Sequence, residues 1–419
     1  MAELLPVADA RAAVMAEVRG QLPAEAVPLG EALGRVLAVD AVSGEDVPGW
    51  DNSAMDGYAV RSADTARADA DSPVTLRLAG ESRAGEPAGG ALGEGEAFRI
   101  STGGVVPAGA DAVVRVEDTD QYEGGRAGDD GTGEVKVRVQ VDSGRDIRRA
   151  GEDIRTGDSV LKAGAVLGSA EVGVLASIGI ADPECARRPT LTVVCTGDEL
   201  LDPSEPMRPG GVRNSNAYTL RALAELAGAE VVSVERCADN PGATRAAMEH
   251  ATQADVAVFC GGVSVGVHDH VKDAFAAIGI EERFWGVALR PGKPTWFGVG
   301  EESLAFGLPG NPVSAMVTFI LFVRPALRAL HGASPELDVV EAILADDVPR
   351  MERRDQAVRC GLTATAEGWL ATPTGPQGSH VLTSMLGADA LTVVEAGADP
   401  ATAGSSVRAE LLGIPSGIQ

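Results

Sequence analysis

The stretch GLPGNPVSA at residues 307 to 315 ends an apolar strand in a rigid turn and begins a helix at once. Pro309 and Pro312 fix two φ angles, and Gly310 permits a backbone geometry that other residues resist. Asn311 is placed to cap the helix that Pro312 opens as its first residue. Because a helix start carries unpaired N–H groups and the positive end of the helix dipole, the turn predicts a phosphate or oxyanion site. A ligand-free connection is the alternative.

Around this turn, residues 184 to 333 alternate strands and helices, which predicts a doubly wound parallel sheet. The expected strands are 191–195, 229–234, 256–260 and 304–306, and the expected helices are 217–226, 242–252, 271–278 and 313–330. In such a sheet the loops that follow the strands meet at one edge, where ligands bind.

The loops at this edge are rich in acids and glycines: TGDEL (196–200), ADNPG (238–242), GGVSVGVHD (261–269) and GLPGNP (307–312). They bring four acids beside two glycine-rich turns: Asp198, Glu199, Asp239 and Asp269. Carboxylates around phosphate-binding loops suit a hard cation such as Mg²⁺ that bridges them. We therefore predict a metal-assisted phosphate site, with a helix cap or a solvated charge as the alternative for each acid taken singly.

Two cations precede the last of these strands. The segment ALRPGKPTWFG at residues 288 to 298 holds Arg290 and Lys293 around a Pro-Gly turn, in a chain with only four lysines. Paired cations on a stiff turn suit a phosphate or a compact tetrahedral oxyanion, although the G-x-x-x-x-G-K-[ST] phosphate loop is absent. Surface solubility is the alternative.

The composition is acidic, with a net charge of −26 and a pI near 4.5. A field of that sign repels nucleic acid and acidic membranes, so neither is expected as a partner. No run approaches the roughly 18 apolar residues of a membrane-spanning helix, and no signal sequence is visible, so a cytoplasmic location is expected. Five scattered cysteines without C-x-x-C spacing fit buried thiols better than disulfides or zinc.

Two motifs give rival interpretations. GVSVG at residues 262 to 266 matches the G-x-S-x-G of serine hydrolases, but a hydrolase needs the helix directly after the serine. Here Gly266 and two further residues intervene, so Ser264 better suits an oxyanion turn. His268 and His270 could chelate a metal from one strand face, but no third ligand lies near them in the sequence.

The remaining segments differ in pattern from the α/β part. Residues 46 to 142 contain short strands separated by Gly, Pro, Asp and Ser turns, which predicts a β-rich domain. Residues 143 to 183 resume the style of residues 1 to 45, with a helix expected to begin near Asp9 as its N-cap. The β-rich domain is therefore expected as an insertion within a discontinuous first domain. Strands are also expected at 339–344, 357–363, 390–395 and 406–412.

These motifs together resemble the molybdopterin molybdenumtransferases of the MoeA and gephyrin E-domain type over essentially the whole chain. The matching strings, in order, are VPGWDNSAMDGYAVR (47–61), RISTGGVVPAGADAVV (99–114), IRRAGEDI (147–154), TGDEL (196–200), GGVSVG with HDHVK (261–272), RPGKP (290–294), GLPGNPVSA (307–315) and QGSH (377–380). The resemblance implies a multidomain α/β fold: a discontinuous linking domain (1–45 and 143–183), an inserted β-rich domain (46–142), a molybdopterin-binding domain with the parallel doubly wound sheet (184–333) and a C-terminal β-barrel (336–419).

The resemblance also implies the chemistry. Such enzymes hydrolyse adenylylated molybdopterin in a step that depends on Mg²⁺ and molybdate, insert molybdenum at the dithiolene, and release the molybdenum cofactor and AMP. They work as homodimers, with the β-rich domain of one subunit facing the α/β domain of the other. Transient contacts with molybdopterin adenylyltransferase and with molybdoenzymes are implied as well.

Site residues carried over from the family fall into four sets. The catalytic residues are Asp56, Thr102, Glu199, Asp239 and Asp269, of which Glu199, Asp239 and Asp269 would hold the metal. The residues that would bind the pterin and its phosphate are Thr196, Gly197, Asp198, Gly261, Gly262, Ser264, Gly266, Leu308, Pro309, Gly310, Asn311 and Pro312. Molybdate would be held by Arg290, Lys293, Arg354 and Ser379.

Three positions depart from the family pattern: bacterial members often carry lysine where this chain has Gly286 and Arg290, and the aspartate-tyrosine pair often found after the GGVSVG loop is Asp269-His270 here. Arginine keeps the charge but presents a planar fork instead of a point charge. Two alternative functions stay open: a molybdopterin adenylyltransferase and a non-enzymatic scaffold of the gephyrin kind.

Overall fold

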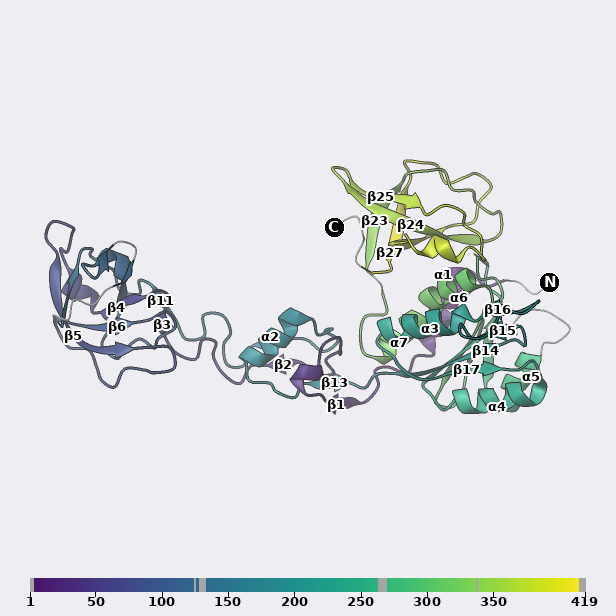
Figure 1. The fold of residues 1–419 in the computed structure, drawn as a ribbon, viewed down its shortest axis with the longest axis horizontal. Coiled ribbons are helices and arrows are strands. Elements are labelled where there is room, and N and C mark those ends of the chain that lie inside the picture. Colours follow the sequence, from purple (N-terminus) through teal and green to yellow (C-terminus); the bar gives the residue numbers. More distant parts are fainter. Residues whose placement is uncertain (1–3, 124–125, 128–132, 263–269, 337, 414–419) are drawn as a thin grey trace.

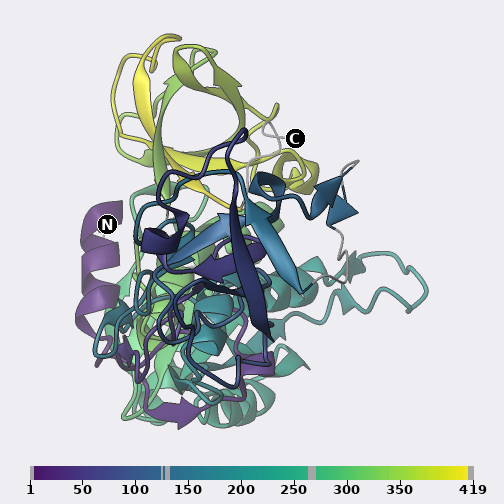
Figure 2. The same cartoon turned by 90° about the vertical axis from the view of Figure 1, so that its left-hand side faces the viewer.

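The computed structural model describes residues 4–123, 126–127, 133–262, 270–336 and 338–413. The molecule is elongated, with a β-rich region at one end, an α/β region at the other and a linking region between them (Figure 1). The C-terminal region lies above the α/β region, as the view turned by 90° also shows (Figure 2). The chain thus separates the predicted site residues of the β-rich region from those of the α/β region.

The α/β region is built on a six-stranded sheet of order β17-β14-β18-β22-β21-β19. The first four strands are parallel, and β21 pairs antiparallel with both of its neighbours. The strand bounds are β14 Thr190–Thr196, β17 Glu230–Cys237, β18 Val256–Cys260, β19 Glu281–Trp285, β21 Trp296–Val299 and β22 Leu304–Leu308. The two central strands β18 and β22 are buried along their whole length, as expected for strands covered on both faces.

Helices cover both faces of this sheet (Figure 1). They are α1 Val7–Ala16, α3 Ser215–Leu226, α4 Pro241–Ala251, α5 His270–Ala277, and a continuous helix made of α6 Pro312–Thr318, the π turn η4 Phe319–Val323 and α7 Arg324–Leu330. Pro325 explains the π turn, because a proline ring inside a helix clashes with the carbonyl one turn earlier. Near the start of the chain, α1 begins at Val7 after Pro6, so the prediction of Asp9 as its N-cap was wrong and Asp9 lies in the first turn.

The long helix Pro312–Leu330 contains 19 residues and, by length and composition alone, is apolar enough to cross a membrane. No apolar run of this length was expected from the sequence. The two arginines of the segment, Arg324 and Arg328, lie in its C-terminal part and leave the rest apolar. Within the fold, 78% of an 18-residue window of this helix is buried, and its apolar side chains belong to the largest hydrophobic core. Burial of this kind is typical of the core helix of a globular domain.

The linking region combines chain segments from before and after the β-rich region. Its two antiparallel pairs are β1 Ala24–Ala26 with β13 Glu184–Ala186, and β2 Ala41–Val42 with β12 Ser159–Leu161. Helix α2 Ser169–Ser177 packs on a small core that includes Leu37, Leu167 and Leu175. The β-rich region contains a five-stranded sheet of order β10-β5-β6-β4-β7, with bounds β4 Gly57–Val60, β5 Val74–Ser82, β6 Glu96–Ile100, β7 Ala112–Arg115 and β10 Glu134–Val137.

The C-terminal region is a closed five-stranded barrel, since β24 pairs with both β25 and β26. Its strands are β23 Val339–Leu344, β24 Asp355–Thr365, β25 Gly368–Pro373, β26 Ala390–Val394 and β27 Ser406–Leu411. The short strand β20 Leu289–Arg290, which leaves the α/β region, pairs in parallel with the start of β24. This pairing fixes the Arg-Pro-Gly-Lys turn against the barrel.

Candidate functional site

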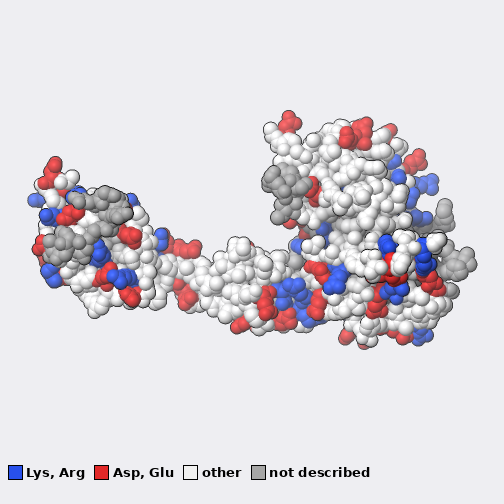
Figure 3. All heavy atoms as spheres, viewed as in Figure 1, with Lys and Arg blue, Asp and Glu red and all other residues white. Residues whose placement is uncertain are grey.

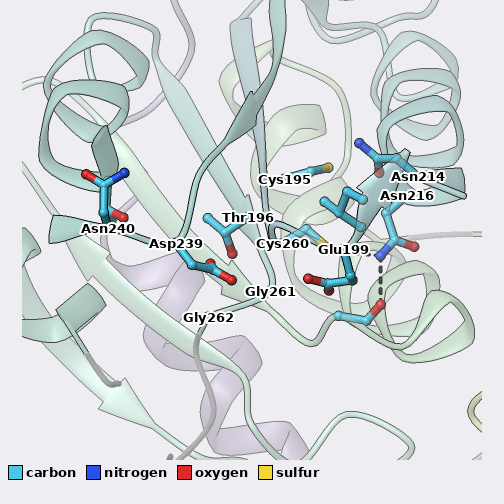
Figure 4. Close-up of a pocket in the computed structure, with 14 residues that line it drawn as sticks. Cys195, Thr196, Glu199, Asn214, Asn216, Asp239, Asn240, Cys260, Gly261 and Gly262 are labelled. Carbon is cyan, nitrogen blue, oxygen red and sulfur yellow. Dashed lines mark hydrogen bonds between the residues drawn. The ribbon is translucent and has the colours of Figure 1, made fainter. Parts of the chain in front are cut away.

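A cavity of about 550 Å³ lies at the carboxyl ends of β14, β18 and β22, where the predicted loops meet (Figure 4). We name it the rim cavity. Seven predicted residues line it: Thr196, Gly197, Glu199, Asp239, Gly261, Gly262 and Gly310. The carboxylates of Glu199 and Asp239 point into it from two different strand ends, with Gly261 between them in the view of Figure 4.

Hydrogen bonds between the loops hold this edge in place. The backbone N–H of Asp198 donates to the Asp239 carboxylate at 3.4 Å, and that of Asp239 donates to the Asp198 carboxylate at 3.3 Å. Asn240 caps α4 by accepting from Ala243 N–H at 2.9 Å, with Pro241 in the first turn. The acids after β14 and β17 are therefore positioned by each other and by a helix start.

Close backbone approach shapes the floor of the rim cavity. Gly261 has φ +92°, and a Cβ there would lie 2.9 Å from the carbonyl oxygen of Thr196. Two buried oxygen atoms that line the cavity have no hydrogen-bond partner among the described residues: Thr196 Oγ1 and Asn216 Oδ1. Gly261 leaves room for a ligand here. The Thr196 hydroxyl can donate to a phosphate oxygen, and the Asn216 amide oxygen can accept from a sugar hydroxyl.

Ser264, Gly266 and Asp269 lie outside the described residues. Asp198, Leu308, Pro309 and Pro312 belong to the same loops as the lining residues, and Gly261 N–H donates to the Leu308 carbonyl at 3.1 Å. Within the described ranges no group of three His, Cys, Asp or Glu side chains is placed to hold a metal ion. The two rim carboxylates still suit Mg²⁺, since this ion binds one or two carboxylates together with substrate phosphates.

A second cavity of about 390 Å³ lies between the α/β region and the barrel. We name it the cation cavity, because Arg290, Lys293 and Arg354 line it together with Ser379 and Asn311. The pairing of β20 with β24 explains this convergence: Arg290 lies opposite Gln356, two residues after Arg354. All four predicted molybdate residues are thus brought to one cavity from three separate segments.

The LPGN turn forms part of both cavities, with Gly310 on the rim cavity and Asn311 on the cation cavity. The sequence predicted that the Asn311 side chain caps the helix, and this was wrong. Asn311 occupies the N-cap position, but its side chain makes no cap hydrogen bond. Its Nδ2 donates instead to Ser379 Oγ at 3.3 Å, which connects the turn to the barrel.

Behind the cation cavity lies Arg359, a fully buried arginine that the sequence analysis missed. Its Nη2 donates to the carbonyls of Pro376 and Gly378 at 3.4 and 3.5 Å, and its Nη1 has no partner among the described residues. Burial lowers the pKa of Arg359 to about 10. The guanidinium therefore supports the loop that carries Ser379 and adds positive charge beneath it.

Asp56 directly precedes β4 and Thr102 follows β6, so both belong to the β-rich region, which lies at the opposite end of the molecule from the α/β region (Figure 1). Thr102 donates to Asp56 Oδ1 from its backbone N at 2.7 Å and from its hydroxyl at 3.0 Å. Both residues are exposed, so the pair faces solvent in the isolated chain.

Other lining residues were missed by the sequence analysis: Cys195, Asn214, Asn216, Thr244 and Cys260 in the rim cavity, and Ser314, Gln377 and His380 in the cation cavity. The string RNSN at residues 213 to 216 precedes a helix and carried a signal, because Asn214 caps α3 by accepting from Ala217 N–H at 3.2 Å. Gln377 and His380 belong to the QGSH string that matched the family.

Comparison with family models assigns every major part of the chain. Residues 5–179 match the MoeA N-terminal region (domain I and II), residues 192–329 match a probable molybdopterin binding domain, and residues 341–412 match the MoeA C-terminal region (domain IV). The fold and its two cavities thus define a multidomain protein built around a molybdopterin-binding type of α/β domain.

Relatives that match over nearly the full length of the chain support the same assignment. The chain is 34% identical to a molybdopterin molybdenumtransferase of Haemophilus influenzae, over 97% of this chain and 98% of that protein. It is 32% identical to one from Staphylococcus aureus, over 96% and 94%. A crystal structure of a molybdopterin biosynthesis MoeA protein from Pyrococcus horikoshii superposes with a TM-score of 0.82 at 32% identity, covering 98% of this chain and all of that one. The chain belongs to the MoeA family of molybdopterin molybdenumtransferases, the transferases of molybdenum cofactor biosynthesis.

Proposed function

We propose that the chain binds adenylylated molybdopterin in the rim cavity and molybdate in the cation cavity, hydrolyses the adenylate, inserts molybdenum, and releases the molybdenum cofactor and AMP. The observation that carries this proposal is the LPGN turn, whose adjacent residues Gly310 and Asn311 line the two cavities. A molecule that spans this turn would present one end to the carboxylates and the other to the cations.

In the rim cavity, Glu199 and Asp239 would hold Mg²⁺, together with Asp269. The bound ion would neutralise phosphate charge and so favour departure of the adenylate. The unpaired Thr196 Oγ1 would donate a hydrogen bond to a phosphate oxygen, and Gly261, which has no side chain, would leave room for the phosphate.

In the cation cavity, Arg290, Lys293 and Arg354 would hold molybdate, and Ser379 would donate a hydrogen bond to it. The net charge of the chain is −26, so an oxyanion needs a local cluster of cations. Figure 3 shows acidic and basic side chains close to one another on the β-rich and α/β regions of the face in view. Arg359 would position the loop that carries Ser379, through its hydrogen bonds to the Pro376 and Gly378 carbonyls.

Asp56 and Thr102 would complete the catalytic site from the partner subunit of a homodimer. The β-rich region lies at the opposite end of the molecule from the α/β region that holds the rim cavity, which supports this arrangement (Figure 1). The linking region also exposes large apolar side chains of the kind that subunit contacts bury: Leu33, Val39, Val42 and Val166. In Figure 3 its face around α2 carries few charged side chains.

We also place the enzyme in the cytoplasm, in keeping with five free and buried cysteines. Transient contacts with molybdopterin adenylyltransferase and with molybdoenzymes follow from the proposed reaction, since the former makes its substrate and the latter use its product.

The test is incubation of the purified protein with adenylylated molybdopterin, Mg²⁺ and molybdate, with AMP measured over time. We expect AMP release that stops when Mg²⁺ is chelated or molybdate is omitted. Pyrophosphate release from ATP and molybdopterin, without AMP release, would instead identify an adenylyltransferase and overturn the proposal.

A further inference from the structure

Two thiols lie side by side at the floor of the rim cavity. Cys195 on β14 and Cys260 on β18 are register partners on adjacent parallel strands. Both belong to the same hydrophobic core, so their side chains point to the same face of the sheet, and they are 1% and 2% exposed. Both also line the rim cavity (Figure 4), which gives small molecules a route to them.

The Cys260 thiol is connected to the LPGN turn. Its Sγ accepts a hydrogen bond from Asn216 Nδ2 at 3.1 Å and donates to the Pro309 carbonyl at 3.4 Å. The same Asn216 Nδ2 donates to the Gly310 carbonyl at 2.8 Å (Figure 4). Any chemical change at Cys260 therefore acts on the turn that separates the two cavities.

The pKa values of the two thiols shift in opposite directions. The interaction between the two thiols lowers the pKa of Cys195 and, together with burial, raises the pKa of Cys260. The thiolate is the reactive form of cysteine, so Cys195 would react first and Cys260 would resolve the product.

The backbone spacing of the two positions also falls within the range that disulfides use. Directly paired residues on adjacent strands have Cα atoms about 5 Å apart, which falls within the range of roughly 4.4 to 6.8 Å that disulfides use. We propose that Cys195 and Cys260 form an oxidisable dithiol whose closure to a disulfide switches the enzyme off. The loss of activity rests on the proposed function, whereas formation of the disulfide does not.

The oxidant belongs to the hydroperoxide class. The Cys195 thiolate attacks one peroxide oxygen, which breaks the O–O bond and leaves a sulfenic acid and hydroxide; the hydroxide takes up the proton that the thiol released and becomes water. The Cys260 sulfur then attacks the Cys195 sulfur and displaces a second water. In total, two thiols lose two electrons and two protons while one hydrogen peroxide becomes two waters.

The other three cysteines provide internal controls. Cys185 lies in the linking region and Cys360 in the barrel, each within a separate core. Cys237 ends β17 and packs in the core on the other face of the sheet. Only Cys195 and Cys260 share both a strand pairing and a core.

The experiment treats the purified protein with hydrogen peroxide, then alkylates it with N-ethylmaleimide in denaturant and determines its mass. The chain has five cysteines, so we expect five adducts in the reduced protein and three after oxidation, restored to five by dithiothreitol. AMP release should fall by about tenfold to a hundredfold on oxidation and recover on reduction. Five adducts after oxidation, or linkage between two chains, would overturn the proposal.

Matched variants separate the dithiol from other effects. Cys185→Ser should respond to peroxide as the wild type does, losing two adducts. In Cys195→Ser and Cys195→Ala, peroxide should not form a disulfide, and the ratio of AMP release before and after treatment should stay near one. Two variants are used so that one that fails to fold does not end the test. If two adducts are lost but AMP release is unchanged, the disulfide forms but does not regulate the enzyme, and the proposed function is unaffected. If AMP is never released, the proposed function is wrong, while the loss of two adducts still shows the disulfide.

Discussion

Asn311 Nδ2 donates to Ser379 Oγ at 3.3 Å, which joins the turn after β22 to the loop before η5 Leu382–Met385 of the barrel. The Val313 N–H also donates to the Ser379 carbonyl, at 3.2 Å. These two bonds hold the cation cavity closed on one side. They make the position of Ser379 depend on the turn that borders the rim cavity.

Asn311→Ala removes the side-chain bond and leaves the helix start intact, because Asn311 makes no side-chain cap. We expect the molybdate concentration at half-maximal AMP release to rise about fivefold, the effect of one neutral hydrogen bond worth about 1 kcal/mol. The melting temperature should stay near that of the wild type. An unchanged molybdate midpoint would show that the backbone bond from Val313 alone positions Ser379.

Lys293→Ala tests the cation cavity directly. Loss of a charged hydrogen bond costs about 1.5 to 3 kcal/mol, so the molybdate midpoint should rise by roughly tenfold to more than a hundredfold. Binding of the pterin nucleotide should change far less, since it has its own loops. Lys136→Ala is the matched control, because Lys136 lies on β10 of the β-rich region. Equal midpoints in the two variants would move the molybdate assignment to Arg290 or the barrel.

A mixture of Asp56→Ala and Glu199→Ala chains tests the composite site. If the β-rich region serves the partner, a mixed dimer keeps one intact site, and random mixing should restore about a quarter of wild-type AMP release. Mixing Asp56→Ala with Thr102→Ala is the control, since both sites of that dimer are damaged and no recovery is expected. Failure of the first pair to recover, with mixed dimers demonstrated by mass, would place the site within one chain.

Much of the fold followed from local patterns. The strand at Val256–Cys260 matched its prediction at both ends, because a buried central strand has a continuous apolar run between turn residues. Strands β19 and β21 were missed, because Glu281 to Trp285 mixes charges with aromatics and its pairing is decided by tertiary contacts. The relationship between Arg354 and Arg290 depends on the pairing of β20 with β24, which no local pattern encodes.

The candidate site was likewise predictable only where the local sequence carries the signal. The acids and glycines of the rim cavity were found because each follows a strand. Arg359 was missed, because a buried arginine sits in a strand pattern that differs little from that of an exposed one. The pairing of Cys195 with Cys260 depends on strand order, and the side-chain bond of Asn311 competes with a cap that its sequence position equally allows.

His331 gives the chain a pH-dependent stability. Burial, followed by the nearby Arg35, Arg188 and Arg328, lowers its pKa from 6.5 to about 4. The unfolded chain therefore binds a proton at His331 more readily than the folded chain does. The neutral His331 adds to the free energy of unfolding above pH 6.5, and this contribution is lost as the pH falls towards 4. Between pH 7 and 5 the wild type should lose about 2 kcal/mol more unfolding free energy than His331→Gln does. Parallel losses in denaturant titrations would remove His331 as the cause.

The resemblance to the family implies a lysine at the position of Gly286, and the structure gives a reason for glycine here. Its φ is +88°, and a Cβ would lie 2.9 Å from Cδ2 of Leu4. Its N–H donates to the Thr295 carbonyl at 2.8 Å, and its carbonyl accepts from Leu5 N–H at 3.1 Å, so the backbone is held from both sides. A side chain therefore meets both a strained backbone and an occupied space.

We expect Gly286→Ala and Gly286→Lys to destabilise the α/β region by about 1 to 3 kcal/mol, the cost of holding a residue with a side chain at such a φ. The lysine should not lower the molybdate midpoint, because its Cβ starts against Leu4. Gly173→Ala is the matched control: Gly173 lies in α2 with nothing within 4 Å of its Cβ position, so alanine there should stabilise the linking region by up to about 1 kcal/mol. Calorimetric scans of the three variants measure these changes in stability. A Gly286→Lys protein with wild-type melting and a lower molybdate midpoint would show that the segment around Leu4 moves readily and that the cation cavity accepts a fourth cation.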